Sequence, residues 1–235
     1  MCDINAFKTQ LFQYLKTILD SKLLTPMYCV VFGSQIYGTK TPNSDWDIYC
    51  VVEQDSHNSS VLFDIHDTEL KIDLTIRSID LFLKDIKSGQ PLSIEVLLTP
   101  EKYQLIQCDQ ISQIGNTINF NNPEMKKQIR HGFSEKASWS EVRARKKLKD
   151  GEVLCALKSL YHSHRILCFG IQIGTYGTII DWEQGKEYLK ELLSLDPNNL
   201  DDQYMRQSYK KWTKTGCSKC KKDSIQTQFK SVFPK

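Results

Sequence analysis

Three aspartates in the first third of the chain are spaced so that their carboxylates could act together. Asp45 and Asp47 stand two residues apart at the start of a run that continues with apolar residues to position 52. Side chains two apart on a β-strand point to the same face, so both carboxylates would share one face of a sheet. Asp73 lies between two apolar residues in another strand-like run. We expect the three carboxylates to converge.

A cluster of this kind is costly without a cation, because neighbouring carboxylates raise one another's pKa. Mg²⁺ removes that cost, and it prefers oxygen ligands while leaving positions for water and phosphate. Two ions about 3.5 to 4 Å apart can stabilise the attacking and leaving oxygens of an in-line phosphoryl displacement. The residues predict a site for two Mg²⁺ ions, with Mn²⁺ as a substitute. The alternative is structural: Asp45 in a turn, Asp47 facing water, and Asp73 salt-bridged on its strand.

Gly33-Ser34 adds a second chemical signal. The pair ends a β-rich run over 27–32 and precedes a turn or helix start at Gln35. Its backbone N–H groups and the Ser34 hydroxyl could cradle phosphate oxygens, and glycine allows the backbone to approach a ligand closely. A lone Gly-Ser is weak evidence, but a Gly-Ser after a strand, followed by Asp-x-Asp and a third strand aspartate, is a specific combination.

The elements that would position these residues follow from the hydrophobic pattern. Apolar spacing predicts a helix over 4–20 and strands over 27–32, 45–52, 61–66 and 69–76, with a short hairpin link at 67–68. Helices are expected over 79–87 and 92–98, and then, after 123, over 125–149, 151–169 and 182–195. Gly170, Gly174 and Gly177 are interpreted as loop residues. We therefore expect an α/β (α+β) domain with a short mixed sheet over 1–120, and a mostly helical domain with a polar tail over 121–235.

At this point a family resemblance becomes visible. The segments 32–39 and 41–47, which contain Phe-Gly-Ser and Pro-x-Ser-Asp-x-Asp, resemble the signature of the DNA polymerase β-like nucleotidyltransferases. Within that superfamily the chain is similar to the predicted nucleotidyltransferases linked to RNA repair, over about residues 28–100. It differs from that branch at Gln35 and Ile36, where a basic and a small residue are expected.

The resemblance implies transfer of a nucleoside monophosphate from an NTP, with release of pyrophosphate. It implies that Asp45, Asp47 and Asp73 bind the metal ions, with Asp73 also suited to act as general base. Nucleotide-binding positions implied in the same way are Gly33, Ser34 and Ser44. In the helical part, spacing brings Lys158, His162 and Arg165 near one helix face, from which they could contact triphosphate or base. The pattern Tyr161-His162-x-x-Arg165 faintly resembles the corresponding helix of that branch, and the alternative is an ordinary helix with exposed charges.

Charge and composition bear on the acceptor. The net charge is only +3, but basic residues concentrate over 126–149 and again over 210–222. Either run would suit a polyanion, although each could equally be a solvated helix face. The leading hypothesis is therefore transfer of NMP to an RNA end. The alternatives are AMP transfer to a protein or small molecule, or a nucleotide- or RNA-binding module without catalysis.

The remaining features concern location and cysteine chemistry. The sequence contains neither an apolar run long enough to cross a bilayer nor a signal peptide. We therefore expect a cytoplasmic protein without a membrane partner. Cysteines in strand-like and helical runs, such as Cys29 and Cys50, are expected to be reduced core thiols. Cys217 and Cys220 have the spacing of half a zinc site, but no second Cys-x-x-Cys follows.

Overall fold

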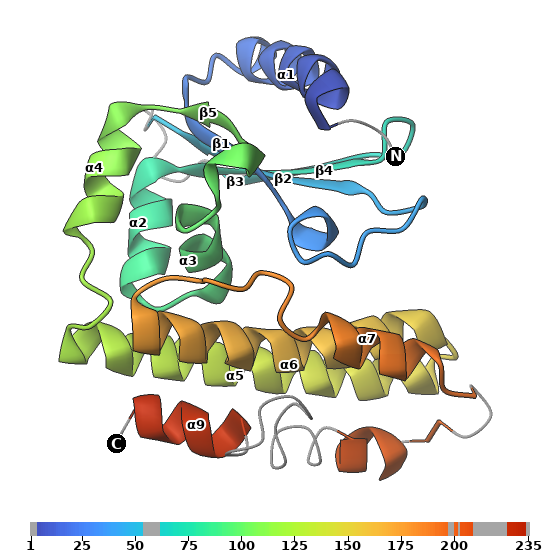
Figure 1. Ribbon diagram of the computed structural model, residues 1–235. Coiled ribbons are helices and arrows are strands. Elements are labelled where there is room, and N and C mark those ends of the chain that lie inside the picture. The colour runs from blue at the N-terminus through green and yellow to red at the C-terminus, as the bar shows by residue number, and fades with distance from the viewer. Residues whose placement is uncertain (1–3, 54–61, 197–199, 202, 209–224, 234–235) are drawn as a thin grey trace. The chain divides into compact units, whose positions relative to one another are not determined.

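The computed structural model describes residues 4–53, 62–196, 200–201, 203–208 and 225–233 (Figure 1). The chain divides into two compact units. The first comprises residues 1–36, 40–85 and 95–118, and the second comprises 37–39, 86–94 and 119–235. The expected boundary near residue 120 stays a prediction, since two short earlier segments group with the second unit.

The first unit is built around a mixed five-stranded sheet in the order β3-β4-β2-β1-β5. Only β2 and β4 run parallel, and the other neighbouring pairs are antiparallel. The strands are β1 (Pro26–Phe32), β2 (Trp46–Val52), β3 (Leu62–Asp67), β4 (Ile72–Ser78) and β5 (Gln104–Gln107). The expected mixed α/β architecture with a mixed sheet is confirmed.

Alternation along the strands decides which face is apolar. Helix α1 (Ile4–Ser21) places Leu11, Leu15 and Leu19 against one sheet face, on which Ile48 and Leu74 are among the buried residues. In Figure 1 α1 lies on one side of the sheet, and α2 (Ile79–Lys87) lies on the other. Because alternate residues point away from α1, Asp47 and Asp73 belong to the opposite face. The Tyr49 ring on that face packs against Phe82 of α2, with centroids 5.9 Å apart.

Two elements of this unit were not expected from sequence. Strand β5 follows a 3₁₀ turn at Glu101–Tyr103, pairs with β1 at the sheet edge and leads into α4 (Asp109–Thr117). The side chains of β5 are only partly buried or exposed, so its sequence lacks the apolar run that marks the central strands. The short α3 (Pro91–Leu97) agrees with the expected helix to within one residue at each end.

The hairpin link between β3 and β4 is longer than expected. The Asp67 carboxylate accepts hydrogen bonds from the backbone N–H groups of Glu69 and Leu70, and Lys71 has a φ of 53°. These features extend the turn through Lys71, so β4 begins at Ile72 and not at Glu69.

The second unit is helical. Helices α5 (Pro123–Lys149) and α6 (Val153–Tyr176) lie side by side as a long hairpin, joined by a short turn (Figure 1). The unit also contains α7 (Lys186–Leu193) and α9 (Ile225–Val232). The Asn122 side chain accepts the backbone N–H groups of Glu124 and Met125, which caps α5 one residue before Pro123.

Gly170 and Gly174 lie inside α6, which corrects their interpretation as loop residues. A Cβ at Gly170 would stand 2.7 Å from Cε2 of Phe229, and one at Gly174 would overlap Val232 and Phe233. These glycines therefore provide space for α9, and helix propensity does not explain them. Gly177, with a φ of 73°, caps the end of α6, as glycines at helix ends commonly do.

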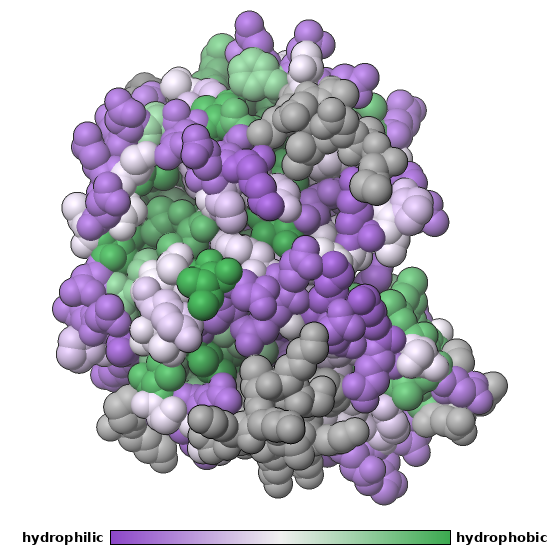
Figure 2. All heavy atoms as spheres, in the orientation of Figure 1, coloured by the Kyte–Doolittle hydropathy of each residue, from purple (hydrophilic) through white to green (hydrophobic). Residues whose placement is uncertain are grey.

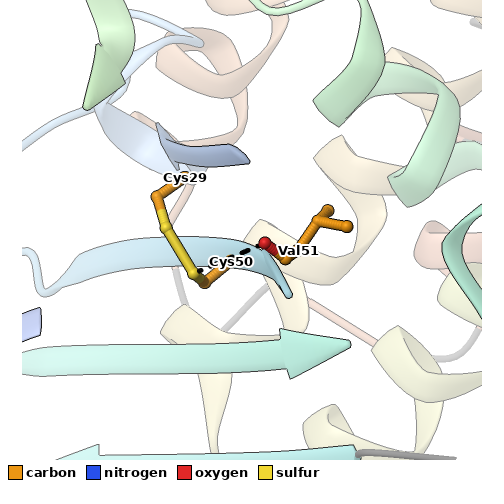
Figure 3. The surroundings of a disulfide bond; sticks show 3 residues. All are labelled: Cys29, Cys50 and Val51. Carbon is orange, nitrogen blue, oxygen red and sulfur yellow. Dashed lines mark hydrogen bonds between the residues drawn. A yellow bond between two sulfur atoms is a disulfide. The ribbon is translucent and has the colours of Figure 1, made fainter. Parts of the chain in front are cut away.

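Cys29 and Cys50 face each other across β1 and β2, and the structure joins them by a disulfide (Figure 3). This corrects the expectation that both are reduced thiols. Antiparallel register, which the sequence does not display, brings the two side chains together. Cys168 is a free, buried thiol, as expected, whereas Cys155 is free but exposed, so it is not a core thiol, and Cys108 is free as well.

The helices of the described residues include none that combines the length and apolarity needed to cross a membrane. On the face shown in Figure 2 hydrophilic side chains occupy much of the surface, with smaller groups of apolar residues between them.

Candidate active site

The Gly33-Ser34 turn and the Asp47 carboxylate are in contact. Phe32 is opposite Asp47 in the β1–β2 register, so the turn that leaves β1 starts beside this carboxylate. Gly33 has a φ of 70°, and a Cβ at this position would overlap the Asp47 side chain. Glycine is thus required here both by backbone conformation and by space. The backbone N–H of Ser34 donates to the Asp47 carboxylate.

Asp47 and Asp73 are direct neighbours across the parallel β2–β4 pair. The residues on either side of each are buried in the α1 face, so alternation places both carboxylates on the opposite face. Asp45 precedes the first residue of β2, which corrects its expected place within the strand. The first β2 residue, Trp46, donates its backbone N–H to the Lys71 carbonyl at 2.7 Å.

The environment of Asp47 disfavours its ionised form. Burial, followed by the negative charges of Asp73 and Asp45, raises the pKa of Asp47 to about 6. The Ser34 hydrogen bond acts in the opposite direction by stabilising the ionised form. The convergence of all three aspartates on one metal site stays a prediction.

His66 is a site neighbour that sequence reasoning missed. It lies opposite Asp73 in the β3–β4 register, and its Nδ1 is hydrogen-bonded to Oδ1 of Asp73. That hydrogen bond, followed by the charge of Asp73, raises the pKa of His66. The available signal was the hairpin itself, because two residues equally far from its turn face each other. The wrong turn length concealed this pairing.

The turn before β2 holds Ser44. Its hydroxyl accepts the Thr41 backbone N–H at 2.9 Å, and its own N–H donates to the Thr41 carbonyl at 3.0 Å. These bonds fix the chain just before Asp45. A nucleotide-binding role for Ser44, as for Gly33 and Ser34, stays a prediction.

The side chains of Asp45, Asp47 and Asp73 offer the oxygen ligands that a hard cation such as Mg²⁺ prefers. The three carboxylates supply only oxygen, and the charges of Asp73 and Asp45 disfavour ionisation of Asp47, a cost that a bound cation would remove. In the part of the chain that the structure describes, no three His, Cys, Asp or Glu side chains lie close enough together to hold a metal ion without moving. Asp73 is engaged with His66, so metal binding would require its carboxylate to turn toward Asp47.

Comparison with known proteins adds little to this geometry. No family model matches the chain, and no curated protein matches its sequence. Among solved structures, the chain is similar to a nucleotidyltransferase-like protein from Exiguobacterium sibiricum 255-15, with 12% identity and a TM-score of 0.36. The alignment covers 93% of this chain and 74% of the other. A likeness of this size carries no argument about family or activity.

The three helical candidates lie in the second unit, and their environments differ. Lys158 is exposed on α6, whereas Arg165 is buried with its guanidinium 3.8 Å from the ring centroid of Tyr37 and 4.8 Å from that of Phe169. An ordinary helix with exposed charges therefore describes Lys158 but not Arg165. Burial lowers the pKa of His162 to about 3, and the nearby positive charges, led by Arg165, act in the same direction. His162 is a neutral imidazole at physiological pH.

The basic run over 126–149 proves heterogeneous. Arg145 is ion-paired with Glu141 at 2.8 Å, and Lys147 with Glu152 at 2.6 Å. Lys136, Arg143, Lys146 and Lys149 are exposed instead. Cys217 and Cys220, and the whole second basic run, lie outside the described residues.

Proposed function

We propose that this chain is a Mg²⁺-dependent nucleotidyltransferase that moves an NMP from an NTP to a hydroxyl acceptor, with an RNA end as the acceptor. The observation that carries the proposal is the direct pairing of Asp47 with Asp73, together with an Asp47 pKa raised by burial and by both other carboxylates. A protein that only bound nucleotides would have no use for the charges of Asp73 and Asp45 beside Asp47, whose ionisation they oppose.

In the proposed reaction the acceptor oxygen forms a bond to the α-phosphorus of the NTP. The bond from that phosphorus to the oxygen bridging to the β-phosphate breaks, and pyrophosphate leaves. Asp73 accepts the hydroxyl proton, and Asp45, Asp47 and Asp73 would hold the metal ions. Bound Mg²⁺ would supply neutralisation of the phosphate charge and stabilise the attacking and leaving oxygens. The Gly33-Ser34 turn contributes the Ser34 hydroxyl toward the phosphates.

The test is incubation of the protein with Mg²⁺, each α-labelled NTP, and separate pools of RNA, protein and small hydroxyl compounds. Label is expected in the RNA pool and should be lost in Asp45→Asn and Asp47→Asn. Asp20→Asn is the matched control, because Asp20 is an exposed aspartate at the end of α1.

Label in the protein or small-molecule pool would replace the acceptor but keep the chemistry. Equal labelling by the wild type and Asp47→Asn would remove the carboxylate assignment, and no labelling of any pool would favour the binding-module alternative.

A further inference from the structure

Helix α5 carries an exposed aromatic side chain among exposed cations. Trp139 is 65% exposed and Val142 is 46% exposed, although large apolar side chains on a helix normally mark its buried face. The buried residues of α5 lie elsewhere on the helix and include Ile129, Phe133, Ala137 and Ala144. Trp139 is therefore not part of the core of the second unit.

The exposed residues around Trp139 form one stripe. Spacings of three, four and seven residues bring them to the same side of the helix. This side, the α5 stripe, consists of Lys136, Trp139, Val142, Arg143, Lys146 and Lys149. It extends about 20 Å at a rise of 1.5 Å per residue. The same spacing places the exposed Glu135 on this side of the helix, and the exposed Asp150 and Glu152 are nearby. Because Glu152 is ion-paired with Lys147, four cations stand against Glu135 and Asp150, and the stripe keeps a net positive charge.

The four cations of the stripe differ from the other basic residues of the unit. Lys127, Lys147, Lys186 and Lys190 each have a carboxylate partner within 4.0 Å. Among the described residues, the stripe's cations make no ion pair. Burial and the charge of Arg165 are the leading causes of the lowered pKa of His162, and Arg143, Lys158 and Lys136 act in the same direction, so the positive field of α5 reaches α6.

An exposed indole among these exposed cations has the chemistry that single-stranded nucleic acid requires. Every base has a π-face that can stack on an aromatic ring, while lysine and arginine neutralise the phosphates between bases. A protein partner would be favoured by a larger apolar patch, whereas this stripe has two apolar residues among four cations.

We propose, on the basis of the nucleotidyltransferase function above, that the α5 stripe binds the single-stranded part of an RNA acceptor. Trp139 stacks on an unpaired base, and Lys136, Arg143, Lys146 and Lys149 contact the flanking phosphates. The α5 stripe contains only part of the basic run over 126–149. Arg145 and Lys147 are ion-paired with Glu141 and Glu152 and do not belong to it.

The test measures binding of a short labelled homopolymer RNA by fluorescence anisotropy over a salt series, with EDTA and without NTP. Trp139→Ala should weaken binding by about five- to 150-fold, the range for loss of one stacked base, with an unchanged salt slope. Trp139→Phe should keep most of the affinity. A duplex RNA competitor should bind without sensitivity to Trp139, because its bases are already stacked.

Two quadruple variants measure the contribution of the cations to RNA binding. The quadruple variant K136Q/R143Q/K146Q/K149Q should reduce the log-log salt slope by about 0.7 for each phosphate that the protein no longer neutralises. The variant K127Q/K147Q/K186Q/K190Q removes the same net charge from ion-paired lysines and should retain the wild-type slope. Circular dichroism melts of all variants confirm that these surface changes preserve folding.

Three outcomes would overturn the proposal: absence of RNA binding at low salt, equal slopes in the two quadruple variants, or unchanged affinity in Trp139→Ala. A concentration-dependent dimer that Trp139→Ala abolishes in sedimentation would assign the stripe to a second copy of the chain. Because the assay needs neither Mg²⁺ nor transfer, its failure leaves nucleotidyl transfer to another acceptor intact.

Discussion

At the scale of single residues, Asp47 interacts with both the turn and the other aspartates of the proposed site. It contacts the Gly33-Ser34 turn, pairs with Asp73 across the parallel strands and lies within the field of Asp45. Its raised pKa means that the folded state holds a proton on this group more readily than the unfolded state does. Folding stability contributed by Asp47 is therefore lost as pH rises from about 4 through about 6.

Asp47→Asn should reverse this loss. In EDTA at pH 8 the variant should be more stable than the wild type, by on the order of 1 to 2 kcal/mol after allowance for solvent screening, and the difference should disappear below about pH 4. Urea unfolding at both pH values measures it, with Asp20→Asn as the control. A gain of equal size at both pH values would mean that the effect does not come from the charge.

At the scale of elements, the α6 glycines distinguish packing from propensity. Gly170 and Gly174 meet Phe229, Phe233 and Val232, whereas a Cβ at Gly115 in α4 would meet only Leu97, at an ordinary 3.7 Å. Gly115→Ala should therefore stabilise the protein by about 0.5 to 1 kcal/mol through helix propensity.

Gly170→Ala and Gly174→Ala should destabilise it by about 1 to 3 kcal/mol, because the added methyl group forces the aromatic neighbours to move. Chemical denaturation of the three variants measures the contrast. If all three gained stability, the packing of α9 against α6 would be wrong.

At the scale of the whole molecule, the two proposed activities belong to different units. The three aspartates lie in the first unit, and the α5 stripe lies in the second. We therefore expect that a substitution in one unit removes its own activity and leaves the ligand affinity of the other unit intact. Asp47→Asn should abolish transfer while keeping the wild-type affinity for single-stranded RNA, and the stripe variant K136Q/R143Q/K146Q/K149Q should keep Mg²⁺-NTP affinity while labelling RNA poorly. Calorimetry with a non-hydrolysable NTP and anisotropy with RNA measure the two affinities. Loss of both affinities in either variant would contradict this separation.

The sequence by itself determined what depends on near neighbours along the chain. Alternation around Asp47 and Asp73 predicted their common face, and the apolar periodicity of α1 and α5 predicted those helices nearly to their ends. A Gly-Ser turn after a strand was equally local, and its glycine proved to be required by a positive φ.

Only the tertiary structure decided the pairings between distant segments. The β2–β4 register places Asp47 beside Asp73, which no local pattern displays, and the actual length of the hairpin turn places His66 opposite Asp73. The β1–β2 register joins Cys29 to Cys50, and α9 explains Gly170 and Gly174. Ion pairing within α5 and its turn separates Arg145 and Lys147 from the exposed cations. In each case the decisive partner comes from a strand or helix face whose register is set by burying apolar surface, a property of the folded chain as a whole.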